Sequence, residues 1–78
     1  MNIKVRVLED FYITDLEVND VWFRKDEEHE LYVPEDDTRY AEIKNQNDNE
    51  FYDVCLFKKD KDSKTWFGDD DVAYLIEV

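Results

Sequence analysis

No stretch of ten or more residues in this chain repeats its apolar side chains at the i, i+3, i+4 spacing of an amphipathic helix. Short runs alternate instead, as where Ile3, Val5 and Val7 are separated by charged residues, and this period of two is typical of a half-buried strand. The 78 residues allow one domain, 1–78. The chain therefore predicts a mainly β fold: a small five- or six-stranded antiparallel barrel or strongly bent sheet, with at most one short helical turn that leads into a closing strand within 72–78.

The apolar runs also predict how the strands are arranged. We expect the strongest one, at 51–57, to lie at the centre of the sheet, and the strands near 21–25 and 31–33 to form a hairpin. The run 58–64 holds four lysines and two aspartates with no apolar residue, which predicts a solvated loop. The predicted core takes the apolar phases of the clearest strands: Val5, Val7, Val54, Leu56, Trp66 and Ile76.

Two residue types occur once and bear on the fold. Cys55 is the only cysteine, so a disulfide within the chain is impossible, and we expect a small core residue in a reducing compartment. Gly68 is the only glycine, and its place before three aspartates predicts a turn with positive φ.

The net charge of −12 limits the possible partners. Such a chain repels nucleic-acid phosphates and anionic membrane surfaces, so we expect neither as a direct ligand. Because 42% of the residues are apolar and 15% are aromatic, the chain has the material for a folded core. The opening residues alternate apolar and charged, and no apolar run approaches the roughly 20 residues of a membrane span. We expect a soluble cytoplasmic protein.

Catalysis and metal binding find little support in the sequence. His29, the only histidine, lies among acidic residues with no nucleophile paired to it, which predicts an exposed loop imidazole and no enzyme. A calcium loop that starts at Asp60 fails, since its fifth and sixth positions are Lys64 and Thr65. At 69–71 a solvated acidic turn is favoured over a weak calcium site. We expect no cofactor and no resident metal.

Three segments resemble the Src-homology-3-like small β-barrel: VLEDFY at 7–12, LEVNDV at 16–21 and AYLIEV at 73–78. Asn19 stands where that family usually has glycine. The resemblance implies a barrel architecture and a peptide-binding or structural interaction module, in which an aromatic groove docks a proline-rich segment. The groove residues that it implies are Phe11, Tyr12, Trp66 and Tyr74.

The charge is concentrated in one part of the chain. Residues 9–37 hold twelve acidic and two basic side chains, a net charge of −10. Duplex DNA carries about one negative charge per 1.7 Å, so this charge matches roughly 20 Å of duplex. We expect some carboxylates near 26–30 and 69–71 to have raised pKa values through mutual repulsion.

In composition the chain resembles phage-encoded or mobile-element DNA mimics, which inhibit CRISPR, restriction or repair enzymes of the host. This resemblance implies an inhibitor that enters the basic cleft of a nucleic-acid-binding protein in the host cytoplasm. The predicted partner-binding residues are Glu9, Asp10, Asp26, Glu27, Glu28, Glu30, Glu35, Asp36, Asp37, Asp69, Asp70 and Asp71.

Overall fold

The computed structural model describes residues 1–35 and 41–78, in which every regular element is a β-strand. None of the described residues forms a helix that could cross a membrane. The strands are β1 (Asn2–Val7), β2 (Phe11–Thr14), β3 (Asp20–Phe23), β4 (Glu28–Tyr32), β5 (Ala41–Asn45), β6 (Glu50–Val54), β7 (Thr65–Phe67) and β8 (Ala73–Glu77).

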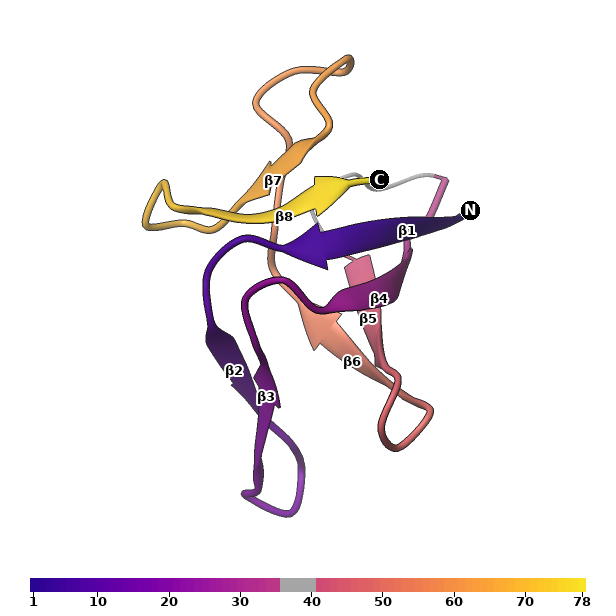
Figure 1. The fold of residues 1–78 in the computed structure, drawn as a ribbon, viewed down its shortest axis with the longest axis vertical. Helices are drawn as coiled ribbons and strands as arrows, with labels where there is room; N and C mark the ends of the chain where they lie inside the picture. Colours follow the sequence, from indigo (N-terminus) through magenta and orange to yellow (C-terminus); the bar gives the residue numbers. More distant parts are fainter. Residues whose placement is uncertain (36–40) are drawn as a thin grey trace.

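Six strands form one antiparallel sheet in the order β6-β5-β4-β1-β8-β7. The other two, β2 and β3, pair with each other as a separate ribbon. Figure 1 shows the sheet curling into a half-barrel and the ribbon extending away from it. The prediction of a mainly β fold with a strongly bent antiparallel sheet is confirmed, and the closing strand is β8, with no helical turn before it.

The core lies on the inner face of the curled sheet. Alternate residues of β1, β4 and β5 point inward, so that Val5, Leu31 and Ile43 are fully buried. Five of the six predicted core residues are buried, and Ile76 is the exception. In β8 it is Leu75 that faces the core, because it pairs with the inward residue Val7, and Ile76 is therefore only half-buried on the other face.

Two predictions about strand arrangement are wrong. The strong strand β6 lies at one end of the strand order and is not central; within 1–35 and 41–78 it pairs only with β5. The strands β3 and β4 do not form a hairpin, since β3 pairs with β2 whereas β4 lies between β1 and β5. Both predictions used local sequence alone, whereas the order of strands depends on pairing with strands that are distant in the chain.

Cys55 and Gly68 also differ from expectation. Cys55 is exposed, because Val54 and Leu56 on either side of it point inward and the alternation turns Cys55 outward. Gly68 does not have a positive φ. Its role is close approach: a Cβ atom there would lie 2.7 Å from Cε2 of Tyr74 and 2.9 Å from Oδ1 of Asp70. Positive φ values occur instead in the acidic turns, at Asp26 (73°) and Asp71 (64°).

Candidate functional site

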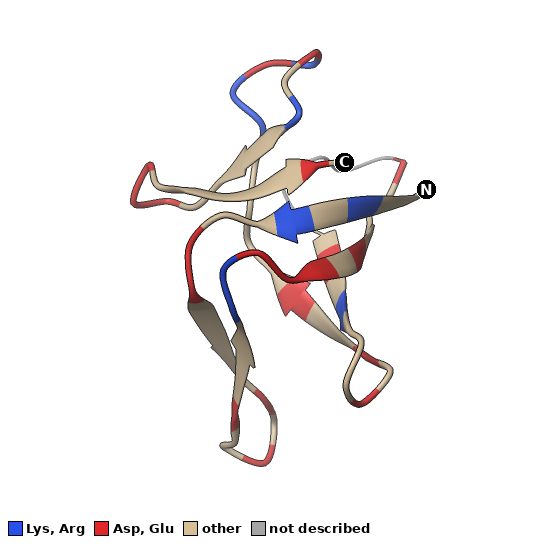
Figure 2. Cartoon of the chain, viewed as in Figure 1, with Lys and Arg blue, Asp and Glu red and all other residues tan. Residues whose placement is uncertain are grey.

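Three acidic turns meet at one end of the sheet. The turn after β1 holds Glu9 and Asp10, and backbone hydrogen bonds tie the end of β1 to the turn before β4 and to strand β8, which follows the turn 69–71. On one side, the Val7 N–H donates to the Glu27 carbonyl oxygen at 2.8 Å, and on the other the Leu8 N–H donates to the Tyr74 carbonyl oxygen at 2.8 Å. The carboxylates of this acidic end are Glu9, Asp10, Asp26, Glu27, Asp69, Asp70 and Asp71. Figure 2 shows red in each of the three: in the β7–β8 turn at the far left, after β1, and, following a blue stretch, before β4.

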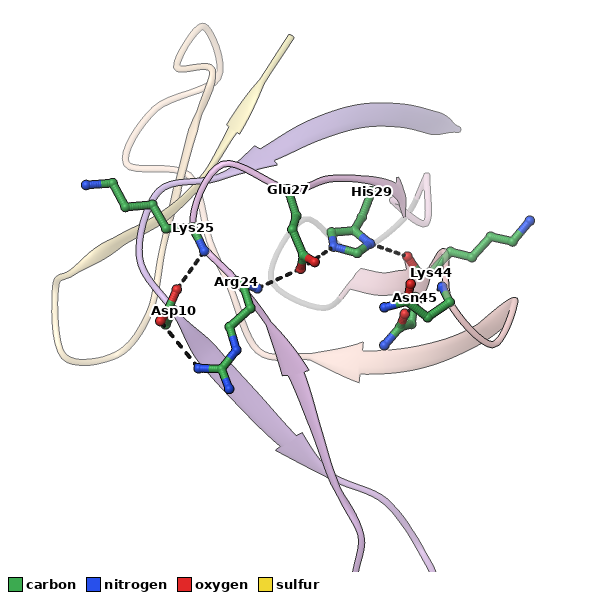
Figure 3. Close-up of polar contacts among 8 residues, drawn as sticks. Asp10, Arg24, Lys25, Glu27, His29, Lys44 and Asn45 are labelled. Atoms are coloured by element: carbon green, nitrogen blue, oxygen red, sulfur yellow. Dashed lines mark hydrogen bonds and ion pairs between the residues drawn. The ribbon is translucent and has the colours of Figure 1, made fainter.

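Two of these carboxylates fix the shape of the acidic end (Figure 3). Asp10 accepts a hydrogen bond from the Lys25 backbone N–H at 2.6 Å, and Arg24 contacts its second oxygen at 3.5 Å. Glu27 accepts a hydrogen bond from the Arg24 backbone N–H at 2.7 Å. The Asp10 bonds run between the turn after β1 and the turn before β4 and hold the two acidic turns in a fixed relation, whereas the Glu27 bond closes the turn 24–27.

His29 is not the exposed loop residue that the sequence predicted. It points inward from β4 and is 3% exposed, because it occupies the same phase as the buried Leu31. Its Nδ1 lies 3.1 Å from the Lys44 carbonyl oxygen and its Nε2 lies 3.3 Å from a Glu27 carboxylate oxygen (Figure 3). Both neighbours are acceptors, and the tautomer of the ring sets which of them receives its N–H. The buried ring thereby positions Glu27 at the acidic end.

The third turn is held by a tyrosine. The Tyr74 hydroxyl donates to Asp70, which also accepts a hydrogen bond from the Val72 N–H at 3.2 Å. The bond from Tyr74, followed by that from Val72, holds the pKa of Asp70 below its usual value, and the same tyrosine bond raises the pKa of Tyr74. The expectation of a raised pKa from repulsion is therefore wrong at Asp70, because a hydrogen bond to the charged form outweighs it.

The other predicted acidic residues lie elsewhere. Glu28 and Glu30 are on the outer face of β4, where Glu28 pairs with Arg6 at 2.9 Å and Glu30 lies in register between Lys4 and Lys44. Glu35 follows β4, at the end of the sheet where β1 begins. Asp36 and Asp37 lie outside the described residues. Seven of the twelve predicted carboxylates are thus brought together.

The charge density of the acidic end can be compared with that of DNA. The turns adjoin the ends of three neighbouring strands, and strands in a sheet lie about 4.8 Å apart, so these strand ends span about 10 Å. The seven carboxylates of the acidic end and three cations (Arg24, Lys25, and Lys59, which pairs with Asp71 at 3.0 Å) leave a net charge of −4. Duplex DNA carries about six charges over about 10 Å of its axis. The two densities are of the same order.

Of the four predicted groove aromatics, three line a groove and one lies in the core. Phe11, Tyr12 and Tyr74 line one open groove together with Asp53, Asp69 and Asp70. Trp66 is wrong as a groove residue: it is 1% exposed and packs in the core, since it faces inward from β7 opposite Leu75. The groove continues past Asp53 along β6, where Phe51 and Glu50 line it.

Sequence reasoning missed Asp53, Glu50 and Asp15, which line this groove, and the exposed pair of Tyr12 with Trp22 on the ribbon. One signal was present for Asp53: it alternates with Tyr52 and Val54, so it was bound to face away from the core. The outward face of β6 borders β2 because of the position of the ribbon relative to the sheet. No local sequence pattern indicates that position.

Within residues 1–35 and 41–78, no group of three or more His, Cys, Asp or Glu side chains is placed to hold a metal ion. Comparison with known proteins finds no family whose model matches this chain, no characterised protein that matches it and no solved structure that matches it. The functional interpretation therefore rests on the geometry of the acidic end and of the groove.

Proposed function

We propose that this protein is a small acidic binding protein that inhibits a nucleic-acid-binding protein by occupying its basic cleft. The observation that carries the proposal is the acidic end, where three neighbouring turns put seven carboxylates at one end of a single sheet. Carboxylates in such a row take the place of phosphates against lysine and arginine side chains. The proposed role needs no catalytic group and no cofactor.

The acidic end combines fixed and available carboxylates. Asp10, Glu27 and Asp70 accept hydrogen bonds that hold the turns in place. Glu9, Asp26 and Asp69 are exposed, and no side-chain hydrogen bond or ion pair involves them within the described part of the chain. A prearranged row with such unengaged charges loses little conformational entropy on binding, which favours a tight complex.

The chemical class of the target follows from the row. A cleft built for a nucleic-acid backbone carries lysine and arginine at the spacing of phosphates, and a rigid acidic row competes for the same groups. The CRISPR, restriction and repair enzymes that phage or mobile-element inhibitors block in the host cytoplasm have such clefts. We propose a target of this class.

A second candidate function, a peptide-binding module, is favoured by a different observation. Three of the four aromatic residues that the small-barrel resemblance implies do line one open groove: Phe11, Tyr12 and Tyr74. The two candidate sites share Asp69 and Asp70, yet they make different demands on a partner. The acidic end requires a basic cleft, whereas the groove requires a segment narrow enough to enter it.

The experiment that tests the inhibitor proposal is competition. A partner captured from host lysate is mixed with the protein and with duplex DNA or guide RNA, and displacement is measured. We expect nucleic acid to displace the protein, and association to slow as salt rises from about 0.05 to about 0.5 M because screening shortens to a few ångströms.

A matched pair of charge-reversal variants locates the interface. Asp26→Lys with Asp69→Lys changes two exposed carboxylates of the acidic end, and we expect binding to weaken by more than about tenfold. Glu35→Lys with Asp62→Lys makes the same change in net charge away from that end and should leave binding nearly unchanged. A partner that binds protein and nucleic acid together, or that responds equally to both double variants, would contradict the proposal.

A further inference from the structure

Two strand edges are uncovered on one side of the molecule. Among the described residues, the sheet ends at β6, which pairs only with β5, and the ribbon ends at β2, which pairs only with β3. No backbone hydrogen bond joins β2 to β6 in the described ranges. Every second residue of such an edge directs its N–H and C=O groups outward, where they are free to pair with another strand.

The two edges border one groove. Its walls are consecutive residues, 11–17 from the ribbon and 50–56 from β6 and the segment that follows it. One strand face would contribute only alternate residues, so consecutive residues mean that the edges themselves line the groove. Its two parts, of about 480 and about 540 Å³, meet at Ile13 and Asp53, which line both. Each part is in the size range of a ligand pocket.

The lining has an apolar component and a single sign of charge. Rings and aliphatic side chains come from both walls and from β8, among them Phe11, Ile13, Phe51 and Tyr74. The charged residues that line it are all acidic: Asp15, Glu17, Glu50, Asp53, Asp69 and Asp70. Among the described lining residues there is no lysine, arginine or histidine, so the groove is complementary to a cationic occupant.

The edge of β6 also lacks the usual protection against strand addition. Natural edge strands are commonly blunted by lysine, by proline or by a bulge. The β6 sequence EFYDV contains neither residue, and its pairing with β5 is regular over five residues. At the other end of the sheet, β7 has three residues, and Phe57 bridges to Phe67. In the described part of the sheet, the β6 edge is therefore the one that is both long and open.

We propose that the groove between β2 and β6 binds an extended, lysine- or arginine-rich segment of a partner protein, which adds as a strand to the β6 edge. Main-chain hydrogen bonds to β6 supply the alignment, alternate side chains of the segment contact the apolar lining, and its cationic side chains meet the carboxylates. The strand β6 has five residues, so a segment of about five residues, some 17 Å long, spans the edge.

This inference deepens the second candidate function, since it specifies the partner segment and its mode of binding. It does not depend on the inhibitor proposal for the acidic end. The two are separable because Asp26 belongs to the acidic end alone, whereas Asp53 belongs to the groove alone.

The test uses a synthetic peptide of four Lys-Val repeats and a control peptide of the same sequence with every second backbone nitrogen methylated. Methylation removes the donors of one edge and keeps the charge. Binding is followed by hydrogen exchange of the β6 backbone amides and by the rate of alkylation of Cys55, an exposed groove residue and the only cysteine. We expect the Lys-Val peptide to slow both processes, and the methylated peptide to bind about tenfold more weakly or worse.

Two charge reversals complete the test. Asp53→Lys, in the middle of the groove, should weaken peptide binding by about tenfold or more, and Asp62→Lys, in the loop 58–64, should change it little. Asp26→Lys should also leave it nearly unchanged, which separates the groove from the acidic end. Equal binding of the methylated peptide, equal losses in the Asp53 and Asp62 variants, or no protection of Cys55 and β6 by the peptide would each overturn the proposal. The amide spectrum of each variant confirms that it is folded.

Discussion

The six-stranded sheet and the β2–β3 ribbon are both built from alternating apolar and polar residues. The sheet buries many more of its apolar side chains than the ribbon does. In the sheet, β1, β4 and β5 each place fully buried side chains against the core, among them Val5, Leu31 and Ile43. In the ribbon only Phe23 is fully buried, and the opposite ribbon face leaves Tyr12 54% exposed. The comparison indicates that the sheet supplies the stability, whereas the ribbon supplies surface for a partner.

A few aromatic contacts hold the ribbon to the sheet. Phe11 meets Tyr74 with ring centroids 5.6 Å apart, and Phe23 meets His29 at 5.0 Å and Tyr52 at 6.3 Å. Each of the two tyrosines also donates its hydroxyl hydrogen to an aspartate four residues earlier. The position of the ribbon, and with it the width of the groove, therefore depends on a small set of rings.

The largest expected effect comes from removing the ribbon's one buried ring. Phe23→Ala should lower the free energy of unfolding by about 3–5 kcal/mol, because it leaves a cavity among His29, Phe11 and Tyr52. A domain this small has about 5 kcal/mol to lose, so much of the variant should be unfolded. Urea denaturation measures the change. Tyr12→Ala, on the exposed face of the same ribbon, should cost about 1 kcal/mol or less. Equal losses would show that the two faces do not differ as described.

A smaller effect is expected at Gly68, in the β7–β8 turn, which lies against the Tyr74 ring that contacts the ribbon. Gly68→Ala places a methyl group 2.7 Å from the Tyr74 ring, so the ring must shift, and this disturbs its contact with Phe11. We expect a loss of about 1–3 kcal/mol in the free energy of unfolding. A double-mutant cycle with Tyr74→Ala checks the cause, since the cost should largely disappear once the ring is absent. A cost that persists there would place the strain at the Asp70 carboxylate, 2.9 Å from the added methyl group.

The smallest effect is expected from the two exposed tyrosine–aspartate bonds, and it depends on pH. The hydrogen bond to Asp48 raises the pKa of Tyr52 to about 12, and the bond to Asp70 raises that of Tyr74. Because the unfolded value is about 10, the stability from Tyr52 is fully present below about pH 10 and is lost between about pH 10 and about pH 12. The same bonds lower the pKa of Asp48 and of Asp70, so their contribution is also lost in acid, below about pH 4.

Denaturation of the wild type and of Tyr52→Phe over the alkaline range measures this contribution. The difference in unfolding free energy between the two proteins should shrink as pH rises through that window. Phenolate absorbance should also show Tyr52 titrating later than a free tyrosine. A difference that stays constant across the window would contradict the assignment of the bond.

The sequence by itself determined the class of fold and most of the core. The alternation at Val5 and Val7, and again at Val54 and Leu56, is a local property, because successive side chains of any strand point to opposite faces. A pattern of period two therefore predicts both the strand and its buried face without reference to a partner strand. Where several apolar residues follow one another, as in β8, the pattern leaves the phase open, and Ile76 was assigned to the wrong face.

Only the tertiary structure decided which residues meet. The acidic end joins Glu9 to Asp26 and Asp69, and the groove joins Ile13 to Asp53, in each case across long stretches of chain. The burial of His29 and the edge position of β6 have the same origin. Strand order is fixed by the summed burial and pairing of distant segments, and a charged residue carries no local mark of the strand that will lie beside it. Composition therefore predicted an acidic surface. The pairing of β1 with β4 and β8 determined which acidic turns lie together.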